Sequence, residues 1–198
     1  MFSGIIQNTE KVRKIIKEKD SLRIEIPIPK NWKIEIGESI NIDGVCSTVE
    51  RIKNKMFSVF YMPETLSKTN LSNVNKGHIL NLEKSLTLNS LIGGHLVSGH
   101  IDTTGKISKI IDEVESRIIT INLPRKFTKY IVYKGSICVN GVSLTIVEVY
   151  DSSFIVSLIP HTLKNTNLGS LKRGDLVNIE IDLIAKYLEK LLPHRVID

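Results

Sequence analysis

Among the residues whose side chains could do acid–base or nucleophilic chemistry, we single out Cys46, Glu64 and His100. A thiol, a carboxylate and an imidazole are groups that move protons or add to an electrophilic ring near neutral pH. Each also has a purely structural explanation. A lone cysteine in a strand-like stretch is more often a small buried apolar residue than a nucleophile, and a histidine that follows Ser98-Gly99 can simply complete a turn. The residue types alone leave both interpretations open.

Motifs of other protein classes are incomplete in this sequence. Residues 141–145 read GVSLT, but a nucleophile elbow needs a second glycine where Thr145 stands and a helix where a strand is predicted to continue. His95 and His100 would point to opposite faces of a strand, so no metal site is predicted. Gly93-Gly94 is not part of a longer glycine-rich loop before a helix, so no phosphate-binding loop is expected.

The chain contains an internal repeat. Residues 37–52 read GESINIDGVCSTVERI and residues 135–149 read GSICVNGVSLTIVEV, with matching glycines 97 residues apart. The same spacing aligns PETLSKTNL with PHTLKNTNL. Near the start, SGIIQNTEKV at 3–12 matches SGHIDTTGKI at 98–107. Two units of about ninety residues account for the chain length better than one domain does.

The repeat shows which candidate residues are informative. A pair of similar sites suits a reaction between two copies of one small molecule, and chemistry that treats the two copies differently requires the sites to differ. The differences that involve reactive groups are Cys46 against Ser143, His100 against Ile5, and Glu64 against His161. We therefore expect these positions to matter most for any such reaction.

Each unit is predicted to be a small β-barrel. Apolar and polar residues alternate in short stretches rich in Ile and Val, as in 21–26, 39–42 and 57–60, with Gly, Asn and Pro between them. Several short strands in so few residues favour a closed barrel, which leaves no exposed sheet edge. After both units, apolar residues recur at helical spacing at Leu183, Ile184, Tyr187, Leu188, Leu191 and Leu192. This helix is expected to pack on its own chain or against another subunit, and the sequence does not decide between them.

Composition narrows the class of protein. The net charge is +6, but the lysines are scattered and interleaved with acidic residues, and aromatic residues are sparse, so nucleic-acid binding is not expected. Two widely separated cysteines predict neither a disulfide framework nor a metal site. The start of the chain lacks the pattern of a signal peptide, and no apolar run is long enough to cross a bilayer. A cytoplasmic protein without membrane association is the resulting expectation.

Several motifs in fixed order resemble the riboflavin synthase family. MFSGII at residues 1–6 resembles the family's opening, which folds into the active site, and GGHLVSGH at 93–100 resembles the linker between its barrels. YKGSI at 133–137, followed by GVSLT, resembles the core motif of the second barrel. The resemblance covers essentially residues 1–190. It favours a functional role for Cys46 and His100 over a purely structural one.

The resemblance implies an all-β fold of two tandem six-stranded antiparallel Greek-key barrels and a C-terminal α-helix. The barrels would span residues 1–94 and 95–184, and the helix and tail at 185–198 would assemble a homotrimer. The implied reaction is a dismutation of two 6,7-dimethyl-8-ribityllumazine molecules, in which a four-carbon unit is transferred to give riboflavin and 5-amino-6-(D-ribitylamino)uracil. No cofactor or metal is implied. The active site would lie between the N-terminal barrel of one subunit and the C-terminal barrel of its neighbour, and assembly with lumazine synthase is left open.

The resemblance also implies ligand contacts in each barrel. Those assigned to the first barrel are Gly4, Ile5, Ile6, Cys46, Ser47, Thr48, Phe60, Tyr61, Met62, Pro63, Glu64 and Thr65, with Phe2 as a further contact. Those assigned to the second are Gly99, His100, Ile101, Lys134, Ser143, Leu144, Thr145, Ile159, Pro160, His161, Thr162, Leu163 and Lys164. The residues expected to transfer protons or assist as nucleophiles are Cys46, His100, Ser143 and Thr145, and those expected to bond ribityl hydroxyls are Glu64, Thr65 and Thr162.

Four positions depart from the family pattern. Asp43 and Ser47 replace the expected Asn and Leu beside Cys46, Asn140 stands where Asp is frequent, and His161 stands where Glu is common. An acid–base role at position 140 and ribityl binding in the second barrel are therefore open. The alternative function is a lumazine or flavin carrier, which shares the fold without turnover.

Overall fold

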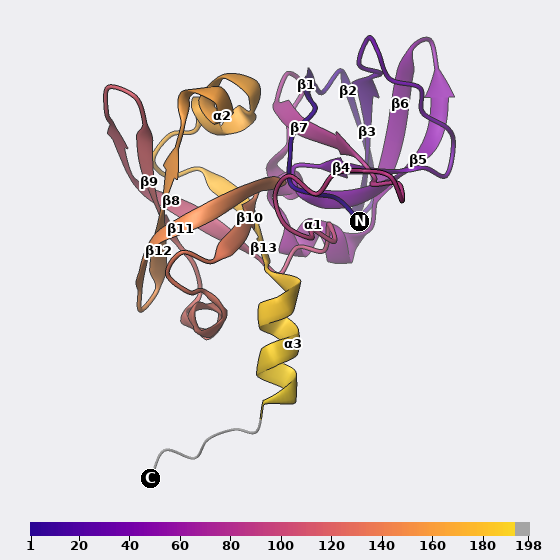
Figure 1. The fold of residues 1–198 in the computed structure, drawn as a ribbon. Coiled ribbons are helices and arrows are strands. Elements are labelled where there is room, and N and C mark those ends of the chain that lie inside the picture. The colour runs from indigo at the N-terminus through magenta and orange to yellow at the C-terminus, as the bar shows by residue number, and fades with distance from the viewer. Residues whose placement is uncertain (193–198) are drawn as a thin grey trace.

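The computed structural model describes residues 1–192, which form two β-barrels side by side and a helix that projects away from both (Figure 1). The strands of the first barrel are β1 (Asn8–Lys11), β2 (Lys14–Glu18), β3 (Ser21–Pro27), β4 (Ser39–Ile42), β5 (Val45–Lys53), β6 (Met56–Tyr61) and β7 (Ile79–Lys84). The helical segments α1 (Pro63–Lys68) and η1 (Asn70–Asn73) connect β6 to β7.

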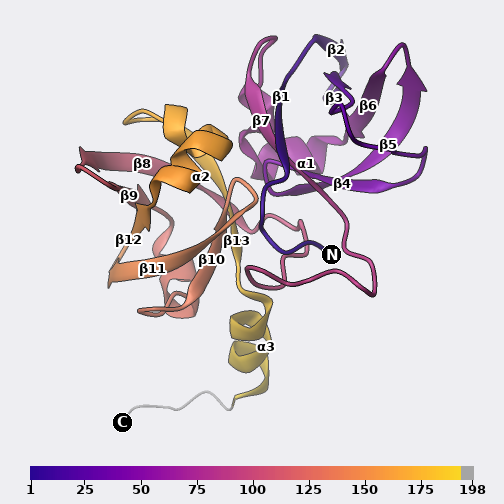
Figure 2. The same ribbon diagram turned by 45° about the horizontal axis from the view of Figure 1, so that its top comes forward.

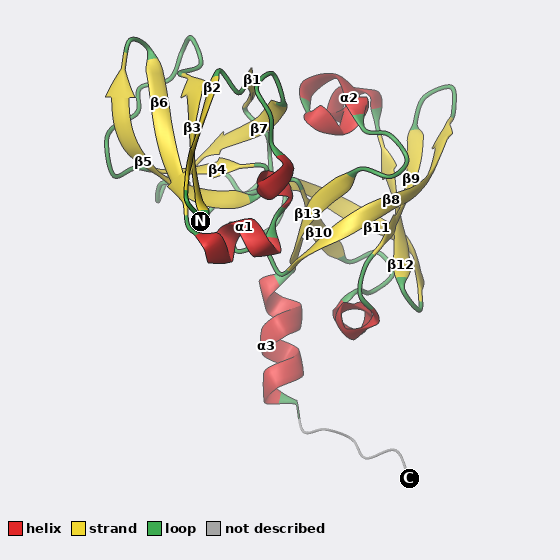
Figure 3. Ribbon diagram, turned by 180° about the vertical axis from the view of Figure 1, so that it is seen from behind, coloured by secondary structure: helices red, strands yellow, loops and turns green. Residues whose placement is uncertain are grey.

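The second barrel repeats this order of elements. Its strands are β8 (Thr103–Asp112), β9 (Arg117–Asn122), β10 (Ser136–Val139), β11 (Val142–Tyr150), β12 (Ser153–Leu158) and β13 (Leu176–Ile181). Its helical segments are η2 (Arg125–Tyr130), α2 (Pro160–Asn165) and η3 (Asn167–Ser170), and α3 (Leu183–Leu191) follows β13. Seen from behind, α1 and α2 lie on different barrels, and α3 extends away from the sheets while its Glu189 pairs with Lys129 of η2 (Figure 3).

The strand order confirms an antiparallel barrel-like sheet in each repeat, of which the second is a closed six-stranded barrel and the first has seven strands. The second sheet is closed in the order β10-β11-β12-β9-β8-β13, in which β9 lies beside β12 to complete a Greek key. The first sheet has the order β1-β7-β4-β5-β6-β3-β2, so its two edge strands are consecutive in the chain. The break falls at Val12 and Arg13, whose N–H groups donate to carbonyls on different neighbours, His78 and Glu25. Together β1 and β2 therefore occupy the place of the single strand β8.

Alternating burial along the strands forms a separate apolar core in each barrel. In β3, for example, Leu22, Ile24 and Ile26 are buried while the residues between them are partly exposed. This is the period of two that a half-buried strand requires. The three stretches predicted as strands from this alternation, 21–26, 39–42 and 57–60, are confirmed as β3, β4 and part of β6.

The barrels meet at two hairpin turns. Asp43-Gly44 joins β4 to β5 and Asn140-Gly141 joins β10 to β11, and all four residues have positive φ, at 48°, 87°, 45° and 81°. Two-residue hairpins of type I′ require positive φ at both positions. A Cβ on Gly44 would lie 2.9 Å from the backbone N of Gly141, so glycine is needed for the turns to touch.

The final helix begins at Leu183, two residues before the start expected at 185, and the last strand of the second barrel, β13, ends at Ile181. Asp182 caps the helix, since its Oδ1 accepts a hydrogen bond of 2.9 Å from the N–H of Ile184. Lys186 pairs with Asp102 at 2.6 Å, which ties the helix to the segment before β8. The end of the tail, 193–198, lies outside the described residues.

Candidate active site

The N-terminal segment runs between the barrels and is held by a buried carboxylate. We call residues 1–7 the first arm (Figure 2). The backbone N–H and the hydroxyl of Ser3 both donate to Glu83 Oε1 at 2.7 Å, and the N–H of Gly4 donates to Glu83 Oε2 at 3.1 Å. Burial raises the pKa of Glu83, and the hydrogen bonds from the arm act in the opposite direction. The carboxylate thus fixes the backbone of the arm at Ser3-Gly4.

The segment before β8 repeats this arrangement. We call residues 96–102 the second arm. The N–H and hydroxyl of Ser98 donate to Glu180 Oε1 at 2.6 and 2.7 Å, and the N–H of Gly99 donates to Oε2 at 2.8 Å. The two arms also pair with each other, because the N–H of Phe2 donates to Val97 O at 2.7 Å and the reverse bond is 3.0 Å. Both arms are therefore firmly placed between the barrels.

Each arm ends against the strand of the other repeat. The N–H of Ser143, on β11 of the second barrel, donates to Gly4 O at 2.8 Å, and the N–H of Cys46, on β5 of the first barrel, donates to Gly99 O at 2.8 Å. A Cβ on Gly4 would lie 2.7 Å from the Ser143 Cβ, and one on Gly99 would lie 2.6 Å from the Cys46 Cβ. Only glycine permits these approaches.

This crossing corrects the grouping of ligand contacts expected from the sequence. Gly4 was placed with Cys46 in the first barrel and Gly99 with Ser143 in the second, whereas the structure exchanges the two glycines. Two further contacts agree with the exchange, because Ile101 packs on the core of the first barrel and Ile6 packs on the core of the second. The first-barrel site is therefore β5 with the second arm, and the second-barrel site is β11 with the first arm.

Ser143 has an imidazole partner that the sequence interpretation missed. His95 Nδ1 lies 2.7 Å from Ser143 Oγ, and the N–H of His95 donates to Ser3 O at 3.1 Å. Burial lowers the pKa of His95, while the charge of Asp182 acts in the opposite direction. A neutral ring can accept the Ser143 proton at Nδ1, as a general base paired with a hydroxyl does.

The first-barrel site is built differently around its thiol. Cys46 is half-buried beneath Gly99, and the next residue in the arm, His100, is exposed. The N–H of His100 donates to Ser98 Oγ at 3.2 Å, so the same serine that binds Glu180 also holds the backbone of His100. Cys46 and the backbone of His100 thus both lie where the second arm meets β5, whereas the sequence interpretation assigned His100 to the second barrel.

Exposed threonines face the same side of each barrel as Cys46 and Ser143. Thr48 lies two residues after Cys46 on β5 and pairs with Ser39, and Thr145 lies two residues after Ser143 on β11 and pairs with Ser136. Residues two apart on a strand share a face. Ser39 and Ser136 were missed by the sequence interpretation, although their spacing of 97 residues could have identified them.

Other predicted contacts surround these strands at the start of a short helix in each barrel. Met62, Pro63 and Glu64 are exposed at the start of α1, and Ile159, Pro160 and His161 are exposed at the start of α2. Glu64 bonds Lys68 at 2.8 Å, and this pairing lowers the pKa of the Glu64 carboxyl. The remaining predicted contacts in these segments are Phe60 and Lys164, which are exposed, and Thr65, Thr162 and Leu163, which are half-buried.

Some predicted contact residues have side chains that point away from these faces. Ser47 Oγ lies 2.9 Å from Tyr61 OH inside the first barrel, and both residues are only 3% exposed. Leu144 packs against the core of the second barrel, and Phe2 is buried between the arms with Val97. The structure therefore does not place these side chains at an open site.

A buried polar network at the two hairpin turns joins the barrels. Asp43 Oδ1 accepts hydrogen bonds from Asn81 N at 2.7 Å and from Asn167 Nδ2 at 2.9 Å. In the mirrored position, Asn140 Oδ1 accepts from Asn178 N at 2.8 Å. Of these two equivalent positions, only the one in the first barrel, Asp43, is a carboxylate, and position 140 in the second barrel is an asparagine.

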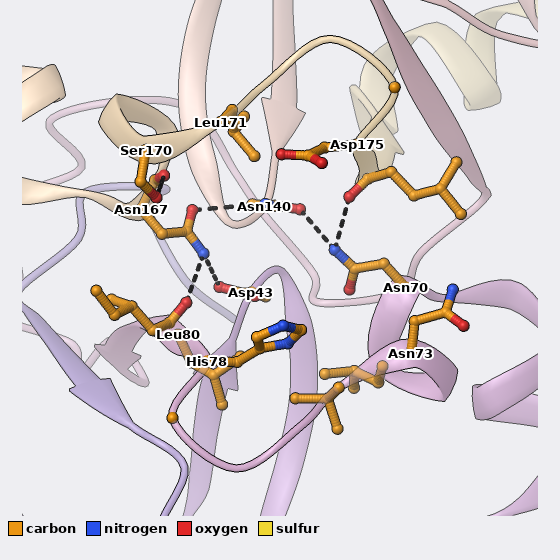
Figure 4. A pocket seen from close by; sticks show the side chains of 16 residues that line it. Asp43, Asn70, Asn73, His78, Leu80, Asn140, Asn167, Ser170, Leu171 and Asp175 are labelled. Atoms are coloured by element: carbon orange, nitrogen blue, oxygen red, sulfur yellow. Dashed lines mark hydrogen bonds between the residues drawn. The ribbon is translucent and has the colours of Figure 1, made fainter.

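The network borders a pocket of about 580 Å³ between the barrels (Figure 4). Its lining comes from both repeats and includes Asp43, Asn70, Asn140, Asn167, His78 and Asp175. None of the ligand contacts predicted from the sequence lines it. The inter-barrel pocket is therefore separate from the first-barrel and second-barrel sites.

The pH dependence of stability provides a test of the Asp43 network. Burial raises the pKa of Asp43 from 3.8 to about 7. Between these values the folded chain keeps a proton that the unfolded chain loses, so stability falls as pH rises towards 7. Asp43→Asn, whose amide oxygen can accept the same bonds, is expected to be more stable than the parent at pH 8 by up to about 4 kcal/mol. Urea unfolding at pH 5 and pH 8 should show a larger gain at pH 8, and an equal gain would contradict the burial argument.

Metal sites are not indicated in the part of the chain that the structure describes. Within residues 1–192, no group of three or more His, Cys, Asp or Glu side chains could hold a metal ion. His95 and His100 belong to different sites, because one bonds Ser143 and the other follows the glycine that covers Cys46. They do not lie on a continuous strand as the sequence argument assumed.

Comparison with known proteins matches both repeats to one family. The model of the family described as "Lumazine binding domain" matches residues 3–85 and again 98–182, and each match starts at the serine of an arm. The riboflavin synthase of Actinobacillus pleuropneumoniae is 42% identical over 193 residues, covering 97% of this chain and 90% of that protein. The riboflavin synthase of Escherichia coli (strain K12) is 42% identical over 186 residues, covering 92% and 87%. The chain belongs to the riboflavin synthase family.

Solved structures extend the similarity to the fold. LumP complexed with riboflavin superposes with a TM-score of 0.86 at 28% identity, covering 91% of this chain and 99% of that chain. LumP complexed with 6,7-dimethyl-8-(1'-D-ribityl) lumazine gives a TM-score of 0.82 at 28% identity, covering 91% and 98%. The chain thus shares its tandem-barrel fold with LumP.

Proposed function

We propose that this protein is a riboflavin synthase. It converts two molecules of 6,7-dimethyl-8-ribityllumazine into one riboflavin and one 5-amino-6-(D-ribitylamino)uracil by transfer of a four-carbon unit. The atoms of the two substrates equal those of the two products, so no oxidant or reductant is needed. The observation that carries the proposal is near-full-length similarity to riboflavin synthases of several bacteria, at 37% to 42% identity.

The duplicated site suits a reaction between two identical rings. The substrate's ring methyl group is unusually acidic because its anion is delocalised into the pteridine, so the protein must chiefly hold two rings together and move protons. Holding reactants in place can supply much of the acceleration. We assign proton transfer or nucleophilic assistance to Cys46, His100, Ser143 and Thr145, with His95 as the partner of Ser143.

A carrier that binds the lumazine or riboflavin without turnover is the second candidate. The similarity to LumP favours it, since the solved LumP structures hold riboflavin or the lumazine. The identity to LumP is 28%, whereas the riboflavin synthase of Bacillus amyloliquefaciens is 39% identical over 193 residues. The retained thiol, the His95–Ser143 pair and the greater identity together favour the enzyme.

One assay separates the two candidates. The purified chain is incubated with 6,7-dimethyl-8-ribityllumazine alone, and products are separated by chromatography. An enzyme yields one riboflavin and one 5-amino-6-(D-ribitylamino)uracil for every two lumazines consumed. A carrier binds the lumazine and shifts its fluorescence while no riboflavin forms, and that result would reject the proposed reaction.

Assembly and location are further parts of the proposal. The part of the chain that the structure describes holds no helix long and apolar enough to cross a membrane. We propose a homotrimer in the cytoplasm, assembled through α3, whose side chains Ile184, Tyr187, Leu188 and Leu191 are all at least half exposed. In such a trimer the first-barrel site of one subunit would face the second-barrel site of its neighbour. Sedimentation equilibrium tests the trimer, and docking into lumazine synthase would be tested by mixing the two proteins.

The backbone of Lys134 supplies a test of its proposed role in substrate binding. Lys134 has φ +62°, and the equivalent position in the first repeat is Gly37 with φ +89°. A left-handed conformation costs an L-residue roughly 1–2 kcal/mol, which the fold tolerates here. Lys134→Gly is therefore expected to leave thermal stability equal or higher while KM for the lumazine rises about tenfold. As a matched control, Lys55→Gly (φ +59° in a hairpin of the first barrel) should change stability similarly and leave KM unchanged. An unchanged KM in Lys134→Gly would contradict the assignment.

A further inference from the structure

Glu83 and Glu180 are buried in barrel strands at equivalent positions of the two repeats. Glu83 lies on β7 and Glu180 lies on β13, and each is only 1% exposed. A buried carboxylate is costly unless its oxygens are hydrogen-bonded. Each carboxylate here receives three hydrogen bonds, and all of these come from the serine and glycine of one arm. These hydrogen bonds therefore hold the arms in place rather than stabilising the barrels.

The placement of the arms explains what these hydrogen bonds accomplish. Glu180 belongs to the second barrel, but the glycine that it fixes, Gly99, accepts a hydrogen bond from the N–H of Cys46 in the first barrel. The serine that it fixes, Ser98, also receives the N–H of His100. One carboxylate thus determines where the backbone lies beside both Cys46 and His100.

Glu83 does the same in the opposite direction. It belongs to the first barrel, and the glycine that it fixes, Gly4, accepts a hydrogen bond from the N–H of Ser143 in the second barrel. The carbonyl of Ser3 receives the N–H of His95, whose ring lies against Ser143 Oγ. Glu83 of the first barrel therefore fixes the backbone that borders the second-barrel site.

We propose that each glutamate is a positioning residue for the site on the opposite barrel. Glu180 sets the first-barrel site through Gly99, and Glu83 sets the second-barrel site through Gly4. This inference rests on the proposed function only for its effect on turnover. The positioning itself is a property of the protein without substrate, and it can be measured without substrate.

The test compares Glu180→Gln with Glu83→Gln in the full-length chain. Glutamine keeps the shape of the side chain but presents an amide NH₂ where one arm N–H needs an acceptor. Glu180→Gln should free the second arm from Cys46, so that iodoacetamide alkylates Cys46 about tenfold faster, while Glu83→Gln leaves this rate within about twofold. A thermal melt of each variant reports general loss of the fold, because Cys138 lies opposite Glu180 and packs against both arms, so that release of an arm could also make it reactive.

The second readout is specific for the other site. Because burial against Ser143 lowers the pKa of His95, Glu83→Gln should raise the pKa of His95 in an NMR titration, whereas Glu180→Gln should not change it. Both variants should lower kcat for riboflavin formation by about tenfold or more. Cys46 reactivity that is unchanged in Glu180→Gln would overturn the proposal. Equal effects of both variants on both readouts would also overturn it, because the action would then not be specific to one site.

A milder pair of variants covers the case in which glutamine prevents folding. Ser98→Ala removes one donor to Glu180, and Ser3→Ala removes the equivalent donor to Glu83. The same selective pattern is expected, with smaller changes in alkylation rate and in the pKa of His95. If the parent protein forms no riboflavin but the labelling and NMR results are selective, the proposed function fails and the positioning role stands.

Discussion

Gly99→Ala is expected to lower kcat for riboflavin formation by about 100-fold, the loss that a displacement of about 1 Å can produce at a reacting centre. The added Cβ would lie 2.6 Å from the Cys46 Cβ and 2.8 Å from the Cys46 N, and Gly99 has φ +82°. The second arm must therefore move away from β5 and carry His100 with it. The measurement is the steady-state rate with the lumazine as sole substrate, together with a thermal melt.

Gly174→Ala is the matched control for backbone strain. Gly174 also has a left-handed backbone, with φ +99°, but a Cβ there meets nothing within 4 Å. This variant should lose about 1 kcal/mol of stability and keep its rate within about twofold. Equal rates for Gly99→Ala and the parent would mean that close contact between the arm and Cys46 is not needed for the reaction.

Cys46→Ser is expected to reduce kcat by about 100-fold with little change in KM, which falls within the range for removal of an acid–base group. A thiol is a stronger nucleophile than a serine hydroxyl and gives up its proton more readily. The variant should fold, because position 143 of the second repeat already holds serine at the equivalent place on β11. Single-turnover and steady-state rates with the lumazine provide the measurement.

Cys138→Ala provides the control for loss of a thiol outside the two sites. Cys138 is buried between the arms with Phe2 and Val97. The Cys138→Ala variant should therefore be less stable than the parent protein but should keep the parental kcat. If Cys46→Ser turned over at the parental rate, Cys46 would be a packing residue and its assignment to catalysis would be wrong.

The repeat made the architecture predictable. Matching glycines 97 residues apart correspond to Gly44 and Gly141, which form the two hairpin turns where the barrels meet. Alternation of apolar residues located β3, β4 and part of β6 because a strand buried on one face has a period of two. The same alternation could have shown that Ser47 faces the interior, since it lies between Cys46 and Thr48 on β5.

The crossing of the arms could not be predicted from the repeat. Alignment of SGIIQ with SGHID places each arm in its own unit, and nothing in those letters indicates which barrel it contacts. That choice depends on hydrogen bonds between residues far apart in the chain, such as Cys46 N to Gly99 O. His95 was missed for a related reason. Its equivalent in the first repeat would precede Met1, so comparison of the repeats has no partner residue to contrast with it.

Equilibrium titration with an unreactive ligand tests the central claim most directly. The ligand is a ribityllumazine that lacks the acidic ring methyl group, so it occupies the sites without turnover. If each barrel forms a site closed by the arm from the other repeat, the parent chain should bind two ligands, and Gly99→Ala should lose one of them. A parent chain that saturates with a single ligand, or that binds none, would contradict this account.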